Sequence, residues 1–329
     1  MRPFIDSWPD RLRTPIKLIP YCELIRKREL PRGACIFADI ERLSTGQACA
    51  LEPVWEQIAA QLPAEAVLNH PTRSMSRFNL LKYAYEQGIN DFNVYWVSEG
   101  ELPERYPVFI RQASEHNGNL TPLLHSEKEL HKALESLPNK AKIYHDLMIV
   151  EFCDISDDQG IYRKYAAFRV GNAIIPRHLF FGREWMQKFD GNMEYNDSML
   201  EEEYAYMEQN PHEPLLRKVA DAAGLRYGRI DYGIKDGRVQ IWEMNTNPML
   251  IQAKKMPKYG NRLPQNERFL ENILKAFGEI GNAFSGPDPV VLCSSAITTA
   301  CYNKLGPKYT TKKIGTRAKY YVKKALGLT

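Results

Sequence analysis

Four polar side chains flank a short turn in the stretch GRIDYGIKDGRVQIWEMNTNP, residues 228–248. Two carboxylates and a side-chain amide are oxygen ligands of the kind that Mg²⁺ takes in proteins, and Mg²⁺ commonly completes its shell with phosphate and water. An arginine beside them could stabilise charge that develops during transfer of a phosphoryl or acyl group. The four residues are Arg229, Asp231, Glu243 and Asn245. They fit equally well an exposed hairpin with a cross-strand Arg–Glu pair, worth about 0.2–1 kcal/mol.

We expect these side chains to lie on a β-hairpin. If residues 235–237 form a three-residue loop with its glycine at positive φ, Arg229 lies opposite Glu243 and Asp231 lies opposite Ile241. All four polar side chains then face one way, because strand side chains alternate. A two-residue loop would shift the register by one residue and break this grouping.

The hairpin resembles the metal-binding end of the ATP-grasp superfamily, in particular the D-alanine–D-alanine ligase branch, whose pattern is R-x-D, a hairpin, then E-x-N-x-x-P. The resemblance implies that Asp231 binds one Mg²⁺, that Glu243 bridges two, and that Asn245 binds the second. It also implies that Arg229 faces the reacting phosphate and carbonyl and is the catalytic residue.

Further segments of the same family follow in order over roughly residues 68–255. SMSRFNLLKYAYEQGI resembles the segment with the first phosphate-contacting lysine, and YPVFIRQ resembles the strand with the second. The matching positions here are Arg77 and Arg111. SEHNGN resembles the loop that closes over the phosphates, and its nucleotide-binding candidates are Ser114, Asn117 and Gly118.

The remaining nucleotide contacts are also implied by the resemblance. IVEFC resembles the hinge at which Glu151 and the backbone of Phe152 and Cys153 meet the adenine. An acidic residue a few positions later binds the ribose in the family, which points to Asp158 or Asp157, and Arg177 in IIPRHLF resembles a phosphate-contacting basic residue. Each position taken alone also fits a surface ion pair, a strand-edge carboxylate or a turn glycine.

Two departures from the family pattern bear on activity. Both family lysines are arginines here, which keep the positive charge but replace a compact ammonium with a planar fork. After Pro248 the chain reads MLIQAKKMPKYG, without the small serine-containing substrate loop of the D-alanine ligases. That substrate is therefore not carried over.

Apolar periodicity places these motifs in a mixed α/β and α+β chain. Two short apolar runs at 34–40 and 64–71 flank a helical stretch, which predicts a strand–helix–strand unit. The resemblance implies an ATP-grasp fold, with two α+β subdomains clasping ATP after a small Rossmann-like N-terminal α/β domain. We expect the N-terminal domain at 1–73, the two subdomains at 74–150 and 151–285, and a basic tail at 286–329.

The composition of the chain indicates where the protein is located and which partners its C-terminal tail could bind. The chain has 329 residues, 44% of them hydrophobic, and no apolar run long enough to span a bilayer or to act as a secretory signal, which predicts a cytoplasmic protein. Its six cysteines include no CxxC pair. From Pro289 onward there are eight basic residues and no acidic ones, which suits an anionic surface or polymer but also a solvated tail. A homodimer is compatible with the resemblance.

These observations favour an ADP-forming ATP-grasp ligase that uses Mg²⁺ and ATP to activate a carboxylate as an acylphosphate for attack by an amine or a thiol. Such chemistry needs positioning and charge neutralisation but no protein nucleophile. The same placement of ATP and metal also serves a kinase-like phosphotransferase, and the two lysine-to-arginine departures suit a non-catalytic nucleotide-binding protein. The identity of the acid and the amine stays open.

Overall fold

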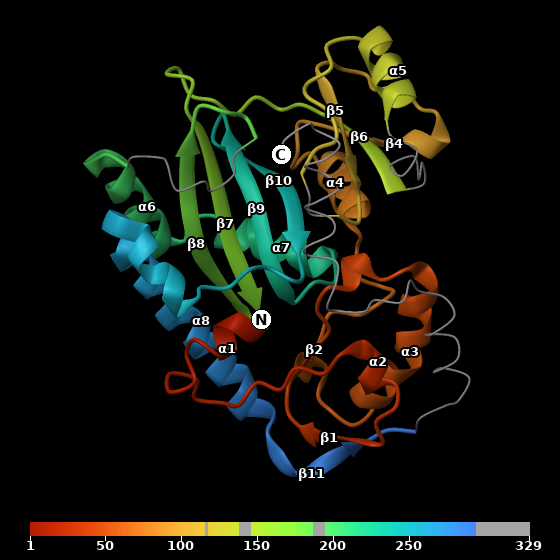
Figure 1. The fold of residues 1–329 in the computed structure, drawn as a ribbon, viewed down its shortest axis with the longest axis vertical. Coiled ribbons are helices and arrows are strands. Elements are labelled where there is room, and N and C mark those ends of the chain that lie inside the picture. The colour runs from red at the N-terminus through yellow and green to blue at the C-terminus, as the bar shows by residue number, and fades with distance from the viewer. Residues whose placement is uncertain (116–117, 138–145, 187–194, 294–329) are drawn as a thin grey trace, which may run out of the picture.

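The computed structural model describes residues 1–115, 118–137, 146–186 and 195–293. Within these stretches the chain forms three groups of elements. Figure 1 shows the first group at one end of the molecule, with the other two next to each other at the opposite end. No helix in the described stretches is long and apolar enough to cross a membrane.

The first group contains the expected strand–helix–strand order. β2 (Cys35–Ile36) and β3 (Val67–Leu68) pair in parallel, and α3 (Thr45–Ala59) connects them. Ser44 starts α3 because its hydroxyl accepts from the backbone of Gln47 while the Gln47 side chain accepts from the Ser44 N–H. Since each strand has only two residues, the Rossmann-like domain stays a prediction.

A second small sheet pairs a strand from the N-terminal part of the chain with a strand close to the end of the described residues. β1 (Glu29–Arg32) pairs antiparallel with β11 (Gly286–Val291), and Val290 is buried among side chains of the first group. The first residues of the expected tail, 286–291, therefore form a strand. The tail's basic residues lie outside the described stretches. The short helices of this group are α2 (Tyr21–Leu24), η1 (Ile40–Arg42) and η2 (Ala64–Ala66), whereas α1 (Arg2–Ile5) contributes Phe4 to the core of the third group.

The second group is a three-stranded antiparallel sheet in the order β4-β6-β5. Its helix α4 begins after Ser76, whose hydroxyl accepts from the N–H of Asn79. Figure 1 shows α4 between this sheet and the next one. The elements are α4 (Arg77–Glu86), β4 (Val94–Trp96), η3 (Val97–Glu99), β5 (Val108–Gln112), α5 (Glu127–Ser136) and β6 (Leu147–Glu151).

The third group is a four-stranded antiparallel sheet in the order β10-β9-β7-β8. Apolar side chains on one face of the sheet pack with α6, α7 and α8 in the largest hydrophobic core. Polar residues of β7, β9 and β10 line a cavity together with residues of the second group. The elements are β7 (Tyr162–Val170), β8 (Ala173–Gly182), α6 (Asp197–Gln209), α7 (Glu213–Ala222), β9 (Tyr227–Lys235), β10 (Arg238–Asn245), η5 (Ala253–Arg262) and α8 (Leu263–Phe284).

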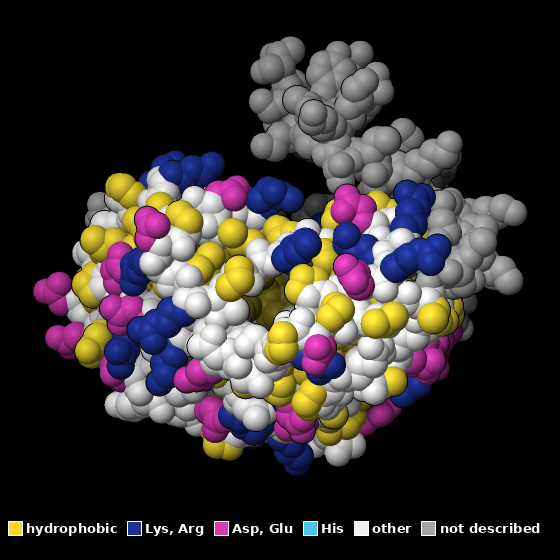
Figure 2. Space-filling model, turned by 90° about the horizontal axis from the view of Figure 1, so that it is seen from below, with side chains coloured by type: hydrophobic (Ala, Val, Ile, Leu, Met, Phe, Trp, Pro, Cys, Tyr) yellow, Lys and Arg dark blue, Asp and Glu magenta, His cyan; other side chains and the backbone are white. Residues whose placement is uncertain are grey.

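The surface shown in Figure 2 carries no segregated block of one charge. Acidic and basic side chains are interspersed there around a hollow lined by hydrophobic side chains. This face gives no support to an anionic surface or polymer as a partner, and that expectation stays a prediction about the tail.

Candidate functional site

The turn between β9 and β10 has two residues, so the three-residue loop expected from the sequence was wrong. Asp236 and Gly237 occupy it with φ of 50° and 75°, and Lys235 pairs directly with Arg238. A two-residue turn with positive φ at both positions matches the twist of the flanking strands, and Asp-Gly is a favoured pair for it.

A β-bulge at Trp242 then shifts the register by one residue. Beyond the bulge Glu243 lies opposite Asp231, and Asn245 lies opposite Arg229. Directly opposed residues in an antiparallel pair share a face. The four polar side chains therefore lie on one face, although through pairs that differ from the expected ones.

Asp231 lies at the centre of this face and is only 1% exposed. Arg229 holds it with two parallel hydrogen bonds, Nε to Oδ1 at 2.6 Å and Nη2 to Oδ2 at 2.9 Å. Lys164 of β7 adds an ion pair to Oδ2 at 2.9 Å. Two cations thus neutralise a carboxylate that would otherwise be costly to bury.

Glu243 is held by arginines from the second group of elements. Arg77 Nη2 lies 2.7 Å from its Oε2, and Arg111 Nη2 lies 3.3 Å from the same oxygen. Burial alone would raise the pKa of Glu243, but the charges of Arg77 and Arg111 outweigh it and hold the pKa below its ordinary value. Burial and the nearby Arg77 charge also lower the pKa of Arg111, to about 10.

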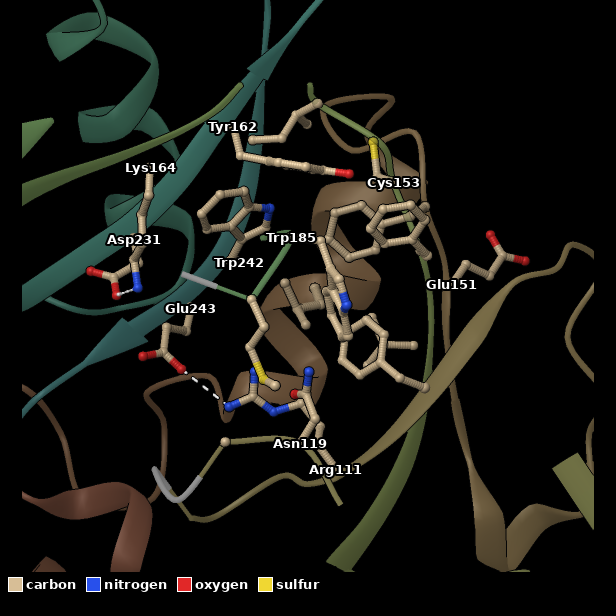
Figure 3. Close-up of a pocket in the computed structure, with 18 of the residues that line it drawn as sticks. Arg111, Asn119, Glu151, Cys153, Tyr162, Lys164, Trp185, Asp231, Trp242 and Glu243 are labelled. Carbon is tan, nitrogen blue, oxygen red and sulfur yellow. Dashed lines mark hydrogen bonds and ion pairs between the residues drawn. The ribbon is translucent and has the colours of Figure 1, made fainter. Parts of the chain in front are cut away.

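These side chains form the charged end of a cavity of about 310 Å³ between the two larger sheets. Figure 3 shows Lys164, Asp231 and Glu243 on the strands of the third group, with Arg111 and Asn119 approaching from the second. The polar lining residues at this end are Arg111, Gly118, Asn119, Lys164, Arg229, Asp231, Glu243 and Asn245.

Aromatic rings line the other end of the cavity. The Trp185 ring lies 5.1 Å from Phe109 and 5.6 Å from Phe152, measured between centroids. Cys153 also lines this end, and burial raises the pKa of its thiol to about 11. The thiol is therefore protonated at neutral pH and is a poor nucleophile.

Gly118 lies where a phosphate loop was expected. It lines the cavity with φ of 93°, a conformation that glycine adopts readily. Asn119 lines the cavity beside it and forms an isolated bridge with Arg111. Asn117, the other loop candidate, lies outside the described residues.

The hinge residues differ in part from the expectation. The carboxylate of Glu151 points away from the cavity (Figure 3), where it accepts from Tyr95 Oη and from Nε and Nη2 of Arg105. The N–H of Phe152 donates to the carbonyl of Pro107 at 2.9 Å, so this donor is already used. The hydrogen bonds of Glu151 hold the hinge in place, and Phe152 lines the cavity.

Three other predicted nucleotide contacts do not line the cavity. Ser114 binds the carboxylate of Asp146 through its N–H and its hydroxyl, at 3.0 and 2.8 Å, which fixes the start of the loop. Asp158 lies in an exposed turn. Arg177 is buried beneath the sheet, where its Nη1 donates to Asn266 at 3.0 Å.

The alternative ribose candidate, Asp157, also has another role. It binds Arg163 Nη1 at 2.6 Å and does not line the cavity. Sequence reasoning missed Lys164, Trp185 and Trp242, which do line it. The only available signal for Lys164 was strand alternation. Ala166 pairs with Asp231, and the residue two positions earlier on β7 faces the same way.

The structure contains a second cavity, of about 270 Å³. Arg77 lines this cavity and not the first one, although it was expected to contact a phosphate. The end of β10 separates the two spaces, with Glu243 lining the first and Met244 lining the second. Other polar residues of the second cavity are Glu41, Thr45, Cys49, Thr72, Ser74, Ser76 and Thr246.

No family model matches the sequence, and a search of curated proteins returned no match. Three solved structures to which the chain is similar are ligases. D-alanine–D-alanine ligase from Bacillus anthracis, complexed with ATP, is 16% identical with a TM-score of 0.37, over 64% of this chain and 69% of that one. The enzyme of the same name from Helicobacter pylori is 18% identical with a TM-score of 0.37, over 70% and 69%. L-amino acid ligase from Bacillus licheniformis is 14% identical with a TM-score of 0.38, over 69% and 60%.

The fold can be assigned from the chain's own elements. Two α+β units face each other across a cavity, and the R-x-D and E-x-N residues of the hairpin lie at its charged end. This arrangement is the one that the sequence resemblance implies. The chain is therefore a mixed α/β protein whose arrangement agrees with the ATP-grasp fold expected from the sequence.

Proposed function

We propose that the first cavity binds ATP together with Mg²⁺, and that the protein is an ADP-forming ligase that joins a carboxylate to an amine. One observation carries this proposal. Arg229 and Asp231 of β9 share one face with Glu243 and Asn245 of β10, at the charged end of a cavity whose other end is aromatic.

The two ends of the cavity suit the two ends of a nucleotide. A purine stacks well on aromatic rings such as Trp185 and Phe152, while a triphosphate needs cations. Arg111, Lys164 and Arg229 supply those cations. We therefore propose that the base binds at the aromatic end and the phosphates at the charged end.

The donor set at the charged end fits Mg²⁺. Asp231 and Glu243 offer carboxylate oxygens, and Asn245 offers an amide oxygen on the same face. In the described residues no cluster of three or more His, Cys, Asp or Glu side chains could hold a metal on its own. Phosphate and water would supply the remaining ligands, and bound Mg²⁺ would neutralise charge on the transferred phosphoryl group.

The chain's own residues suit transfer of that group. A substrate carboxylate oxygen attacks the γ-phosphorus, the bond to ADP breaks, and an acylphosphate forms. The amine nitrogen then attacks the acyl carbon, phosphate leaves, and the nitrogen loses a proton to water. Arg229 and Lys164 line the cavity, and their ion pairs with Asp231 fix them in advance, so they would stabilise negative charge that develops there.

The second cavity provides space for the other reactant. Met244 and Thr246 line it, whereas Glu243 and Asn245, which alternate with them in sequence, line the first cavity. Its hydroxyl groups and the Glu41 carboxylate are polar groups that could orient an amine.

The proposal is tested by incubating the protein with Mg²⁺, ATP and pools of carboxylic acids and amines, and measuring ADP and phosphate. Product formation that needs both pools supports the ligase.

Hydroxylamine then separates the ligase from a phosphotransferase, because it traps an acylphosphate as a hydroxamate but leaves a phosphorylated hydroxyl unchanged. Turnover that survives Glu243→Gln would reject the metal chemistry. Tight ATP binding without turnover in any pool would favour a nucleotide-binding protein.

A further inference from the structure

Arg77 lies in the wall between the two cavities. It is the first residue of α4, its side chain is 3% exposed, and it lines the second cavity. Its Nη2 donates a hydrogen bond to the carboxylate of Glu243, and Glu243 lines the first cavity. Arg111, which lines the first cavity, binds the same carboxylate oxygen at 3.3 Å.

The other terminal nitrogen of Arg77 holds backbone. Nη1 donates to the carbonyl oxygens of Gln112, Ala113 and Glu115 at 3.2, 2.8 and 2.8 Å. Gln112 is the last residue of β5, and Ala113 and Glu115 follow it in the chain before Gly118. A guanidinium can hold backbone on one side and a carboxylate on the other because its donors are spread over a rigid plane. A lysine ammonium concentrates its donors on a single atom and cannot span both sets.

We propose that Arg77 is a positioning residue and not a phosphate ligand. It fixes Glu243 against the backbone of residues 112–115, so that the metal-binding face and this stretch keep one relative position. Arg111, Lys164 and Arg229 line the cavity and hold the phosphates directly. This inference rests on the proposed nucleotide site and explains why an arginine occupies a position where the related pattern has lysine.

Substitution by lysine separates the two roles. If Arg77 contacts phosphate, Arg77→Lys keeps the charge and should bind nucleotide almost as well as the wild type. If it positions Glu243 and residues 112–115, the lysine cannot hold both sets and should behave like Arg77→Met. Losing a buried charge-assisted contact commonly weakens an interaction by about tenfold or more.

The experiment uses the full chain and calorimetric binding of AMP-PNP with Mg²⁺, with adenosine as a probe that lacks phosphates. We expect Arg77→Lys and Arg77→Met to bind AMP-PNP at least about tenfold more weakly than the wild type, and adenosine within about twofold of it. Arg111→Lys and Arg111→Met are the matched pair, and there lysine should recover most of the affinity. Arg77→Lys binding like the wild type, or weaker adenosine binding in both Arg77 variants, would overturn the inference.

A double-mutant cycle tests whether Arg77 acts through Glu243. In a Glu243→Gln background, Arg77→Lys should cause little further loss, whereas additive losses would show that the two residues act separately. If the Arg77 variants fail to fold, hydrogen exchange of wild-type residues 112–115 decides. Protection that persists on adding Mg²⁺ and AMP-PNP supports the inference, and loss of protection contradicts it. A wild-type protein that binds neither AMP-PNP nor ADP would instead reject the nucleotide site itself.

Discussion

Arg229 and Asp231 form a two-point ion pair within a single strand, at 2.6 and 2.9 Å. Because they are two positions apart on β9, their side chains emerge on the same face and meet in the plane of the guanidinium. The R-x-D motif thus fixes its own arginine before any ligand arrives. Preorganised charge of this kind needs little rearrangement during a reaction.

Breaking this pair should affect stability as well as chemistry. Arg229→Met removes the two-point partner of the buried Asp231 carboxylate and leaves it paired with Lys164, so we expect the free energy of unfolding to fall by about 3 kcal/mol. Urea denaturation measures it. Adding Asp231→Asn should return part of the loss, because the unpaired charge is then gone. Equal stability of Arg229→Met and the wild type would contradict the buried pair.

The ion pairs of Glu243 predict a pH dependence of stability. Its pKa in the folded protein is below the ordinary value, because Arg77 and Arg111 outweigh the effect of burial. A carboxylate with a lowered pKa contributes stability above its unfolded pKa of about 4.3, and loses that contribution as the pH falls toward the folded pKa. The difference in unfolding free energy between wild type and Glu243→Gln should therefore be constant from about pH 6 to 8 and shrink below about pH 4. A difference that grows on acidification would show that the pKa is raised.

The aromatic end of the cavity predicts a fluorescence response. Trp185 and Trp242 both line the cavity, so adenosine and AMP-PNP should change tryptophan emission (Figure 3). Trp185→Ala removes a stacking surface worth about 1–3 kcal/mol, and should weaken the binding of adenosine and of AMP-PNP by the same factor, about 5 to 150. Weakening of AMP-PNP alone would place the base elsewhere.

Two glycines of the hairpin give a matched pair of substitutions. A Cβ at Gly228 would lie 2.8 Å from the backbone oxygen of Asn245, whereas a Cβ at Gly237 would meet open space. Gly237→Ala carries only the backbone strain of positive φ, about 1 kcal/mol. Gly228→Ala must also separate β9 from β10, so we expect a loss of about 3 kcal/mol and weaker AMP-PNP binding.

Thermal denaturation and calorimetry distinguish the two glycine variants. The Gly237 variant should bind AMP-PNP like the wild type, since the turn lies away from the cavity. Similar stability losses in both variants would argue that the close approach at Asn245 relaxes without cost.

The sequence predicted the hairpin and its four polar residues, but not how they come together. The predicted loop was one residue too long. The four side chains still share a face because the bulge at Trp242 shifts the register by one residue. This bulge depends on tertiary packing. The Trp242 ring lies over Gly233, where a Cβ would come within 2.6 Å of it. A packing relationship between two strands is invisible to periodicity, which reads one strand at a time.

Of the predicted nucleotide contacts, some line the cavity and others bind neighbouring protein groups. Arg111 and Gly118 line the cavity as expected, and the sequence pattern had located the strand and the loop that carry them. Arg177 and Ser114 matched in position but hold neighbouring protein groups instead. Whether a basic or polar side chain points into a cavity or into the protein depends on local partners, and those partners are distant in sequence.

The pairing of β1 with β11 has a consequence for how the protein can be divided. A strand from residues 286–291 completes a unit that begins some 250 positions earlier, with Val290 fully buried among its apolar side chains. An isolated fragment of residues 1–73 would expose an unpaired strand edge and an apolar hollow, and would be prone to self-association. The N-terminal unit should therefore be an inseparable part of the whole polypeptide, which should melt in a single transition and not in stages.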